Sequence, residues 1–271
     1  MNNVVITGAC GGIGKAIALH FAKNGWNVIC TMMRLEHVKE FQGIENISCY
    51  ELDVTSTASI AAAKKKILED FESIDVVINN AGKGYRSFVE FAEDDEINTI
   101  VDVNWLGVVK VCRAFIPVFR KQKKGQFINI SSIAGLVNLP LGSFYHSTKH
   151  AVESFSECMA YELIDFNISV ATVQFGNTPS GFQNNVVKTG HTSLESYNYL
   201  MDKICLILEN KTKKNTDLKP LIVSELLKIA NNPATNFKRY TIGFDAKGLN
   251  LLRNKLGYLL FGRIIRKSIF K

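Results

Sequence analysis

The sequence predicts an α/β fold, a doubly wound parallel sheet in a single domain that spans residues 1–271. Short runs rich in Val and Ile alternate with segments of helical periodicity. These runs are almost continuously apolar, which is typical of parallel strands covered by helices on both faces. No linker rich in Pro or Ser, internal repeat or low-complexity tract divides the chain, so one domain is expected.

The expected strands and helices follow one another in alternation. The apolar runs that predict strands cover residues 3–7, 27–32, 47–54, 74–82, 125–132, 168–176 and 239–243. Helical periodicity is found at residues 12–24, 55–71, 94–121 and 144–166, with a shorter stretch at 35–41. Right-handed crossovers between parallel strands place helices on both sides of such a sheet.

The segment of residues 178–220 breaks this alternation because it is polar, rich in Asn and Lys, and only partly helical. It follows the last residues of an expected strand, on the edge where open parallel sheets bind ligands. Long connections in compact domains are usually functional or disordered. We interpret this segment as a substrate lid, in preference to an ordinary pair of surface helices.

Charge is unevenly distributed along the chain. The net charge is +7, and the tail of residues 249–271 contributes six basic side chains and no acidic one: Arg253, Lys255, Arg263, Arg266, Lys267 and Lys271. The rest of the chain is nearly neutral, so a nucleic-acid partner is not indicated. The apolar rhythm of the tail favours a helix that docks on the domain or on a second subunit over one that lies on an anionic membrane surface.

The six cysteines are scattered and never form a C-x-x-C pair. Buried free thiols in a reducing compartment are the simplest interpretation, and neither a disulfide scaffold nor a zinc site is indicated. The N-terminus leads into an apolar strand without a charged leader, so no signal peptide is expected. No stretch of about 20 residues is continuously apolar, so no transmembrane helix is expected. A cytoplasmic location is the default expectation.

Residues 3–14, "NVVITGACGGIG", run from the first strand through a glycine-rich turn into the first helix. Gly8 permits the sharp turn, while Gly12 and Gly14 let the backbone approach a pyrophosphate and let the helix pack on the strand. Unpaired N–H groups at the positive end of the helix would then meet the phosphates. The spacing G-x-x-x-G-x-G indicates a dinucleotide site, with a turn that binds no ligand as the alternative.

The residues after the second strand bear on which dinucleotide is bound. An acidic side chain there binds the ribose 2′-hydroxyl of NAD, whereas an arginine accommodates the 2′-phosphate of NADP. The segment "VICTMMRLEH" contains Arg34 and no acid before Glu36. The sequence therefore favours NADP, with NAD as the alternative.

Tyr145 and Lys149 are four residues apart in "FYHSTKHAVESF" and share one face of the expected helix. A lysine ammonium favours the ionised phenol, so it lowers the tyrosine pKa towards the range that a general acid or base needs. His146 and His150 share a different face, and no third metal ligand accompanies them. We interpret both histidines as exposed helix surface and expect no metal site.

These features resemble the classical short-chain dehydrogenase/reductase family. The matching motifs are "TGACGGIG", "LDVT", "NNAG", the "VN" that contains Asn104, "NISS" and "YHSTK", in the family's order and spacing from about residue 3 to 176. The later part is similar to the branch of 17β-hydroxysteroid and retinol dehydrogenase-like enzymes. The resemblance implies a Rossmann-type fold and an NAD(P)-dependent oxidoreductase that transfers hydride between nicotinamide and a secondary alcohol or ketone carbon.

The resemblance also implies roles for single residues. Tyr145 would exchange a proton with the substrate oxygen, and Lys149 would lower the tyrosine pKa and bind the ribose. Ser132 would hydrogen-bond the reacting oxygen, and Asn104 would hold a water in the proton relay. The implied cofactor-binding set is Gly8, Cys10, Gly12, Ile13, Gly14, Arg34, Asp53, Val54, Asn80, Ala81, Gly82, Tyr145, Lys149, Gly176 and Thr178.

Three positions depart from the family pattern. Phe175 stands where a proline is usual before Gly176, and Met33 stands where NADP-using relatives carry an arginine. Cys10 replaces a small hydroxyl residue in the glycine turn. Because a thiol donates poorly to phosphate, we expect a somewhat lower cofactor affinity.

The complete set of motifs favours an active enzyme over the alternative, a catalytically silent NADP-binding sensor or scaffold. Apolar side chains in residues 87–93, 134–143 and 178–215 suggest a medium or large apolar small-molecule substrate. By the same resemblance, the helices expected at 94–121 and 144–166 would pair with their counterparts in a homodimer or homotetramer.

Overall fold

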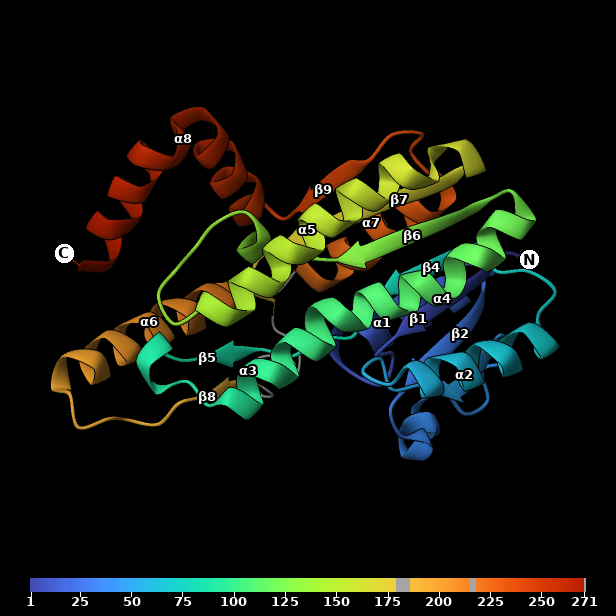
Figure 1. The fold of residues 1–271 in the computed structure, drawn as a ribbon, viewed down its shortest axis with the longest axis horizontal. Coiled ribbons are helices and arrows are strands. Elements are labelled where there is room, and N and C mark those ends of the chain that lie inside the picture. Colours follow the sequence, from blue (N-terminus) through green and yellow to red (C-terminus); the bar gives the residue numbers. More distant parts are fainter. Residues whose placement is uncertain (179–185, 215–217, 271) are drawn as a thin grey trace.

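The computed structural model describes residues 1–178, 186–214 and 218–270, and its centre is a seven-stranded parallel sheet (Figure 1). Its order in space is β3-β2-β1-β4-β6-β7-β9. The chain builds outward from β1 to β3 and then crosses back to β4, and ligands of doubly wound sheets bind where the order reverses in this way. The strands are β1 (Asn3–Thr7), β2 (Asn27–Met32), β3 (Ile47–Glu51), β4 (Val76–Asn79), β6 (Gly125–Ile130), β7 (Ile168–Phe175) and β9 (Lys238–Ile242).

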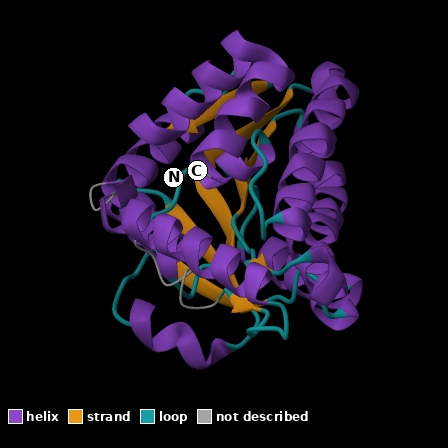
Figure 2. Ribbon diagram, turned by 90° about the vertical axis from the view of Figure 1, so that its left-hand side faces the viewer, coloured by secondary structure: helices purple, strands orange, loops and turns teal. Residues whose placement is uncertain are grey.

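Helices cover both faces of this sheet (Figure 2). On one face, α1 and α7 contribute core side chains such as Phe21 and Leu226; on the other, α2, α4 and α5 contribute side chains such as Ile67, Phe115 and Val152. The predicted doubly wound α/β fold is thereby confirmed. The α-helices are α1 (Gly12–Lys23), α2 (Thr57–Asp70), α3 (Asp94–Val101), α4 (Gly107–Gln122), α5 (Ser143–Leu163), α6 (Glu195–Lys214), α7 (Leu218–Asn231) and α8 (Phe244–Phe270).

Several strands end before the apolar runs that predicted them. Residues 52–54, 80–82 and 131–132 lie beyond the last residues of β3, β4 and β6, in loops at the carboxyl edge of the sheet. The N–H groups of Leu52 and Ser131 still donate to Met32 of β2 and Val173 of β7, but other backbone groups here bond to side chains. The N–H groups of Asn80 and Ala81, for example, both donate to Thr7 Oγ1, at 3.0 and 3.1 Å. The carboxyl edge therefore carries irregular backbone where the expected site residues lie.

The helical stretch expected at residues 94–121 is confirmed, and it contains a π-helical turn, η3 (Asp102–Leu106), between α3 and α4. Asn104 in this turn is fully buried. Immediately after it, Gly107 lies against Val54, whose Cγ2 would be 3.0 Å from an added Cβ. Such π turns often occur at functional sites. The short helical stretch expected at 35–41 forms a 3-10 helix, η1 (Leu35–Phe41).

Only part of the expected lid, residues 178–220, lies apart from the helices that cover the sheet. Residues 179–185 and 215–217 lie outside the described residues, and 218–220 belong to α7, which covers the sheet because its apolar face packs against α1. Between them, β8 (Val187–Lys188) pairs with β5 (Tyr85–Arg86), and α6 packs through Met201 and Ile204 on Leu141.

The basic tail forms α8, which is kinked at Gly257, where φ is +63°. Ile265 and Ile269, beyond the kink, pack in the same apolar cluster as α6. The tail therefore docks on its own chain, as the sequence favours, but through only a few residues; Lys271 lies outside the described part. Among the described residues, no helix has the length and apolar character needed to cross a membrane.

All six cysteines are free, but they are not uniformly buried. Cys30 and Cys112 are buried, whereas Cys158 is exposed because it lies on the outer face of α5. The expectation of buried free thiols therefore holds for Cys30 and Cys112 and is wrong for Cys158. Within the described ranges, no three His, Cys, Asp or Glu side chains gather in a way that could hold a metal ion.

Candidate active site

The glycine turn between β1 and α1 is tightly packed from behind. Gly8 has φ +64° and backs onto Ala81, whose Cα would lie 2.9 Å from an added Cβ. A Cβ at Gly14 would collide with the carbonyl oxygen of Gly8 and lie 2.6 Å from Asn80 Nδ2. Asn80 Nδ2 in turn donates to the carbonyls of Thr7 and Gly8, at 2.9 and 3.1 Å. The turn is therefore held in one conformation by the loop after β4.

The same turn is open towards a cleft of about 560 Å³. The first N–H groups of any helix have no partner within the helix. In α1 the N-cap residue is Gly11, which makes no side-chain bond to them. Oriented donors at the positive end of a helix suit a phosphate group. The geometry of the turn therefore fits the pyrophosphate of a dinucleotide.

Most of the predicted site residues meet in this cleft. Those that line it are Gly8, Cys10, Gly12, Ile13, Gly14, Asn80, Ala81, Gly82, Ser132, Tyr145, Lys149, Gly176 and Thr178. They come from the ends of β1, β4, β6 and β7 and from the first turns of α1 and α5, although up to about 170 positions separate them in the sequence.

Four predicted residues do not line the cleft. Arg34 is exposed in the loop after β2, where it precedes η1. Asp53 accepts hydrogen bonds from the backbone N–H and the Oγ1 of Thr55, both at 2.8 Å. Val54 is buried beside Gly107. The structure thus gives Asp53 and Val54 supporting positions at the carboxyl edge.

Asn104, the fourth, is engaged with the backbone of Lys83. Its Oδ1 accepts from the Lys83 N–H at 2.8 Å, and its Nδ2 donates to the Lys83 carbonyl at 2.9 Å. Because Asn104 is fully buried, it holds the loop after β4 in place. Lys83 itself lines the cleft, so Asn104 lies directly behind the cleft wall.

Tyr145 lies in the first turn of α5, with its ring in the cleft. Burial of the phenol raises its pKa to about 12. A hydrogen bond with Ser132 and the positive charge of Arg86 act in the opposite direction. Ser132 caps the short helical turn η4 (Ile133–Gly135) by accepting from the Ala134 N–H at 3.1 Å. The serine and the tyrosine are therefore already paired.

Lys149 follows one turn later on the same face of α5 and is buried. Its Nζ donates to the Ile130 carbonyl at 2.9 Å and lies 5.9 Å from the centroid of the Tyr145 ring. Burial lowers the pKa of this ammonium to about 8, and the negative charge of Glu153 partly offsets that effect. The predicted Tyr–Lys pair shares one helix face, as its spacing indicates.

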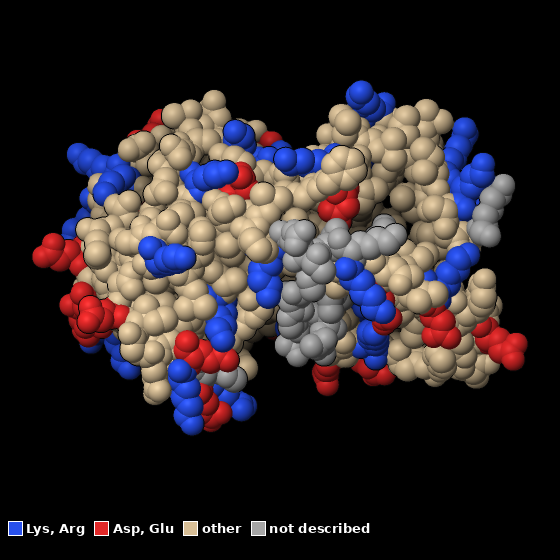
Figure 3. Space-filling model, turned by 180° about the vertical axis from the view of Figure 1, so that it is seen from behind, with Lys and Arg blue, Asp and Glu red and all other residues tan. Residues whose placement is uncertain are grey.

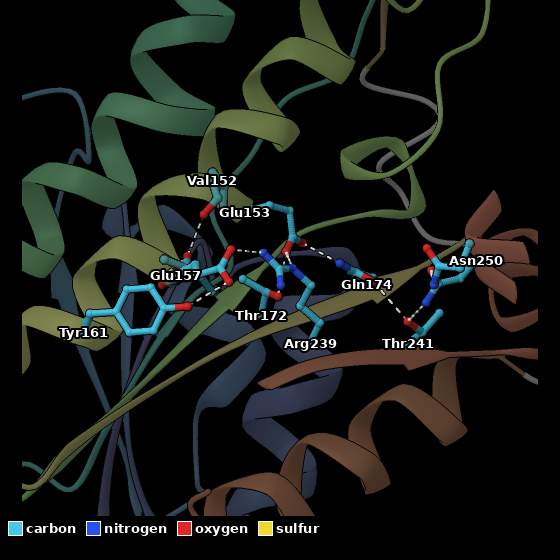
Figure 4. Close-up of polar contacts among 12 residues, drawn as sticks. Val152, Glu153, Glu157, Tyr161, Thr172, Gln174, Arg239, Thr241 and Asn250 are labelled. Carbon is cyan, nitrogen blue, oxygen red and sulfur yellow. Dashed lines mark hydrogen bonds and ion pairs between the residues drawn. The ribbon is translucent and has the colours of Figure 1, made fainter. Parts of the chain in front are cut away.

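Glu153, one turn beyond Lys149, belongs to a polar network under α5 (Figure 4). Its carboxylate accepts from Thr172 Oγ1 at 2.9 Å and Gln174 Nε2 at 2.8 Å, both on β7, and from Arg239 Nε on β9 at 3.0 Å. Gln174 Oε1 accepts from Thr241 Oγ1 at 3.0 Å, and Thr241 Oγ1 in turn accepts from Asn250 Nδ2 of α8 at 3.2 Å. The helix that carries Tyr145 and Lys149 is thereby fastened to β7, β9 and α8.

Sequence reasoning missed several residues of the cleft wall, and three of them are titratable groups near the proposed site. Arg86 lies in β5 and acts electrostatically on Tyr145; it is the only arginine between the "NNAG" loop and α4, which is a usable signal. Asp245 lies against Gly176 at the start of α8, and nothing local in the sequence indicates this. His146 was expected on exposed surface, which is wrong. It is part-buried, lines the cleft and donates from Nδ1 to the Val137 carbonyl.

The loop after β7 retains the hydroxyl that was expected of it. Thr178 is buried, and its Oγ1 donates to the Gly176 carbonyl at 3.2 Å. Phe175, which stands in place of a proline, forms the last residue of β7 and pairs with Ile242 of β9. A proline would not supply the backbone N–H of a strand residue. Phe175 extends the sheet at this corner of the cleft.

A glycine turn at the switch point of a parallel sheet, next to a serine, a tyrosine and a lysine, defines a nucleotide-dependent oxidoreductase. The family profile described as short chain dehydrogenase matches residues 2–190. This chain therefore belongs to the short-chain dehydrogenase/reductase family, and it is an NAD(P)-dependent oxidoreductase.

Three comparisons place it within the family. The 3-ketodihydrosphingosine reductase of Bacteroides thetaiotaomicron is 37% identical over 182 residues, which cover 67% of this chain and 66% of that protein. Dehydrogenase/reductase SDR family member 7 of Mus musculus is 30% identical over 82% of this chain and 70% of its own length. The solved structure of ElxO with NADP bound superimposes with a TM-score of 0.72 at 27% identity, covering 89% of this chain and 97% of ElxO.

Proposed function

We propose that this protein reduces or forms the carbonyl group of a medium or large apolar secondary alcohol/ketone pair, with NADP(H) as the cofactor and Tyr145 as the acid/base. The observation that carries the proposal is the convergence of Ser132, Tyr145 and Lys149 on one cleft with the glycine turn. When bound, the nicotinamide dinucleotide supplies or accepts the hydride.

The chain's own residues would manage the proton. In the reductive direction, the Tyr145 hydroxyl gives its proton to the carbonyl oxygen of the substrate while Ser132 donates a hydrogen bond to the same oxygen. The Tyr145 pKa is raised by burial, so the reaction requires a positive charge nearby to stabilise the phenolate. Arg86 supplies such charge, and the Lys149 ammonium, 5.9 Å from the ring centroid, would add to it. Asn104 would contribute by fixing the Lys83 loop and the water relay beside it.

The preference for NADP is supported by two observations. Arg34 follows β2, the strand next to the glycine turn, and no acid precedes it in that loop. The related ElxO was solved with NADP bound. Arg34 is exposed, so its guanidinium is free of a burial constraint and can turn towards a 2′-phosphate.

An apolar substrate is supported by the aliphatic side chains that line part of the cleft. Val137, Leu139, Leu141, Leu208 and Leu249 line it, and Leu208 and Leu249 come from α6 and α8. The named activity of the bacterial relative, reduction of 3-ketodihydrosphingosine, points in the same direction. We therefore expect long-chain ketones to be better substrates than short ones.

Two measurements test the proposal. Differential scanning fluorimetry should show a larger stabilisation by NADPH than by NADH, and a panel of ketones of increasing chain length should be reduced with NADPH. Tyr145→Phe should keep the thermal shift with NADPH and lose reduction. Reduction that survives this change would refute the assigned mechanism, whereas a wild type that binds NADPH without reducing any ketone would support the sensor or scaffold alternative.

We also propose a homo-oligomer. Trp105, Tyr161 and Ile164 expose apolar surface on the η3–α4 and α5 side of the protein. Pairing of these helices with a second copy would cover that surface. Light scattering coupled to size exclusion should give at least twice the monomer mass of 30.2 kDa.

A further inference from the structure

Helix α8 exposes apolar side chains that its own chain leaves uncovered. Leu251 is 57% exposed, Leu259 is 79% and Phe270 is 63%. One face of the segment beyond the kink is already used, since Phe261, Ile265 and Ile269 follow one another at intervals of four residues and pack inward. The docking of α8 on the domain therefore does not account for these exposed residues, and a helix that leaves large apolar side chains uncovered is a candidate interaction site.

The kink gives this surface its shape. Gly257 adopts φ +63° and ψ −175°, and α8 rises from β9, bends and returns towards α6 as an arch (Figure 1). Tyr258 and Leu259 follow the bend directly. The guanidinium of Arg253 lies 3.4 Å from the centroid of the Tyr258 ring, so the two arms of the arch are joined at the bend. The bend is the part of α8 that stands out from the body.

The charges on the arch have one sign. After Asp245 at its first turn, the described residues of α8 contain Lys247, Arg253, Lys255, Arg263, Arg266 and Lys267 and no acid. Figure 3 shows Lys and Arg along the top and the outer edge of this lobe, at upper right, and no Asp or Glu there. Basic residues and exposed leucines therefore occur together on α8, and helices that lie in a lipid interface carry both kinds of side chain.

Two partners could cover this surface: a second copy of the chain or a phospholipid membrane. The basic charges favour one of them. A second copy would bring an equally basic arch against the first, and like charges would oppose the contact. An anionic phospholipid surface offers phosphates to the basic side chains and an apolar boundary to the leucines. Long basic side chains can lie along that boundary and keep their charged ends among the headgroups.

We propose that α8 docks this protein on the surface of an anionic phospholipid membrane, with Leu259 at the bend inserted at the acyl–headgroup boundary and the surrounding basic residues bound to lipid phosphates. The helix lies on the membrane and does not cross it. Leu249 of α8 and Leu208 of α6 line the cleft, so docking through α8 would bring the wall that they form towards the bilayer. Uptake of a lipid-dissolved ketone from there rests on the proposed function, whereas the docking itself does not.

The experiment is co-sedimentation of the full chain with vesicles of phosphatidylcholine, with and without phosphatidylglycerol. The combined Lys255→Gln, Arg263→Gln, Arg266→Gln and Lys267→Gln variant should bind the anionic vesicles at least tenfold more weakly, because each surface base contributes attraction. A control with the same net charge carries Lys65→Gln, Lys66→Gln, Lys121→Gln and Lys123→Gln, all exposed elsewhere. It should bind almost like the wild type.

The apolar part is tested with Leu259→Ser, which should weaken binding about fivefold. Its control, Leu206→Ser, changes an exposed leucine of α6 and should have little effect. Wild-type protein that ignores anionic vesicles, or variants and controls that bind alike, would overturn the proposal. So would a Leu259→Ser protein whose only change is a lower oligomeric mass, since the arch would then be an interface between copies. Vesicle binding is measured without substrate, so ketone reduction can fail while docking holds.

Discussion

Arg239 of β9 donates through Nε to Glu153 Oε2 of α5 at 3.0 Å, and its Nη2 reaches Glu157, one turn further along the helix, at 2.6 Å. Glu153 is almost completely buried, while Arg239 is about one-third exposed. One cation of an outer strand is thereby shared by two carboxylates on the helix that carries Tyr145 and Lys149. The pKa of Glu157 is lowered by its bond to Arg239.

Removal of this cation should destabilise the fold. Arg239→Met leaves Glu153 buried with the hydrogen bonds from β7 but without its charged partner, so the free energy of unfolding should fall by about 2 kcal/mol in urea denaturation. Lys228→Met, which breaks the exposed pair with Glu225, serves as the control and should cost less than about 0.5 kcal/mol. Equal effects of the two variants would show that the network contributes no more than a surface pair.

Glu153→Gln should change the pH dependence of catalysis. The glutamate raises the Lys149 pKa against the effect of burial, so the neutral variant should lower that pKa below its present value of about 8. Lys149 would then lose its proton at a lower pH, and kcat/KM for ketone reduction should begin to fall at a lower pH than in the wild type. Glu157→Gln, further along α5 and partly exposed, is the matched control. A shift of the same size in both variants would argue against a specific action on Lys149.

Lys149→Met should abolish turnover and yet stabilise the protein without added cofactor. The folded-state pKa of about 8 lies below the ordinary lysine value of about 10.4. Below pH 8 the folded wild type therefore bears the full cost of a buried ammonium, and this cost disappears as the pH rises towards 10. The variant should gain about 1–3 kcal/mol at pH 7 and much less at pH 10, measured by thermal unfolding. A wild type that is the more stable protein at pH 7 would contradict this.

The glycine turn can be tested with two neighbouring alanines. Gly14→Ala should lower the free energy of unfolding by about 2–3 kcal/mol and remove the thermal shift with NADPH, because its Cβ collides with Gly8 and Asn80. Gly11→Ala is the control, since nothing lies within 4 Å of an added Cβ and the residue has an extended backbone. It should keep the wild-type stability. If both alanines are tolerated, the tight packing behind the turn is not needed.

Features that depend on neighbours in the sequence could be predicted. The apolar runs located all seven strands of the main sheet, because a strand that packs against helices is apolar over the four to eight residues of its own length. The spacing of Tyr145 and Lys149 placed them on one face of α5, because a helix repeats every 3.6 residues. The glycine turn could be predicted for the same reason, because its glycines lie within one short motif. Most of the candidate site therefore lay within two short motifs and the ends of strands.

The remaining features depend on residues that are distant in the chain, and the tertiary structure alone decided them. Arg86 reaches Tyr145 only because β5 lies beside α5, and Asp245 meets Gly176 only because α8 begins where β7 ends. Asn104 in the π turn hydrogen-bonds to the backbone of Lys83, and the partners of Glu153 come from two strands. The sequence by itself determined the fold class and the proton-transfer pair, since both follow from local periodicity. Packing decided which charges surround that pair and which face of α8 remains exposed, since no local pattern records what a distant element will cover.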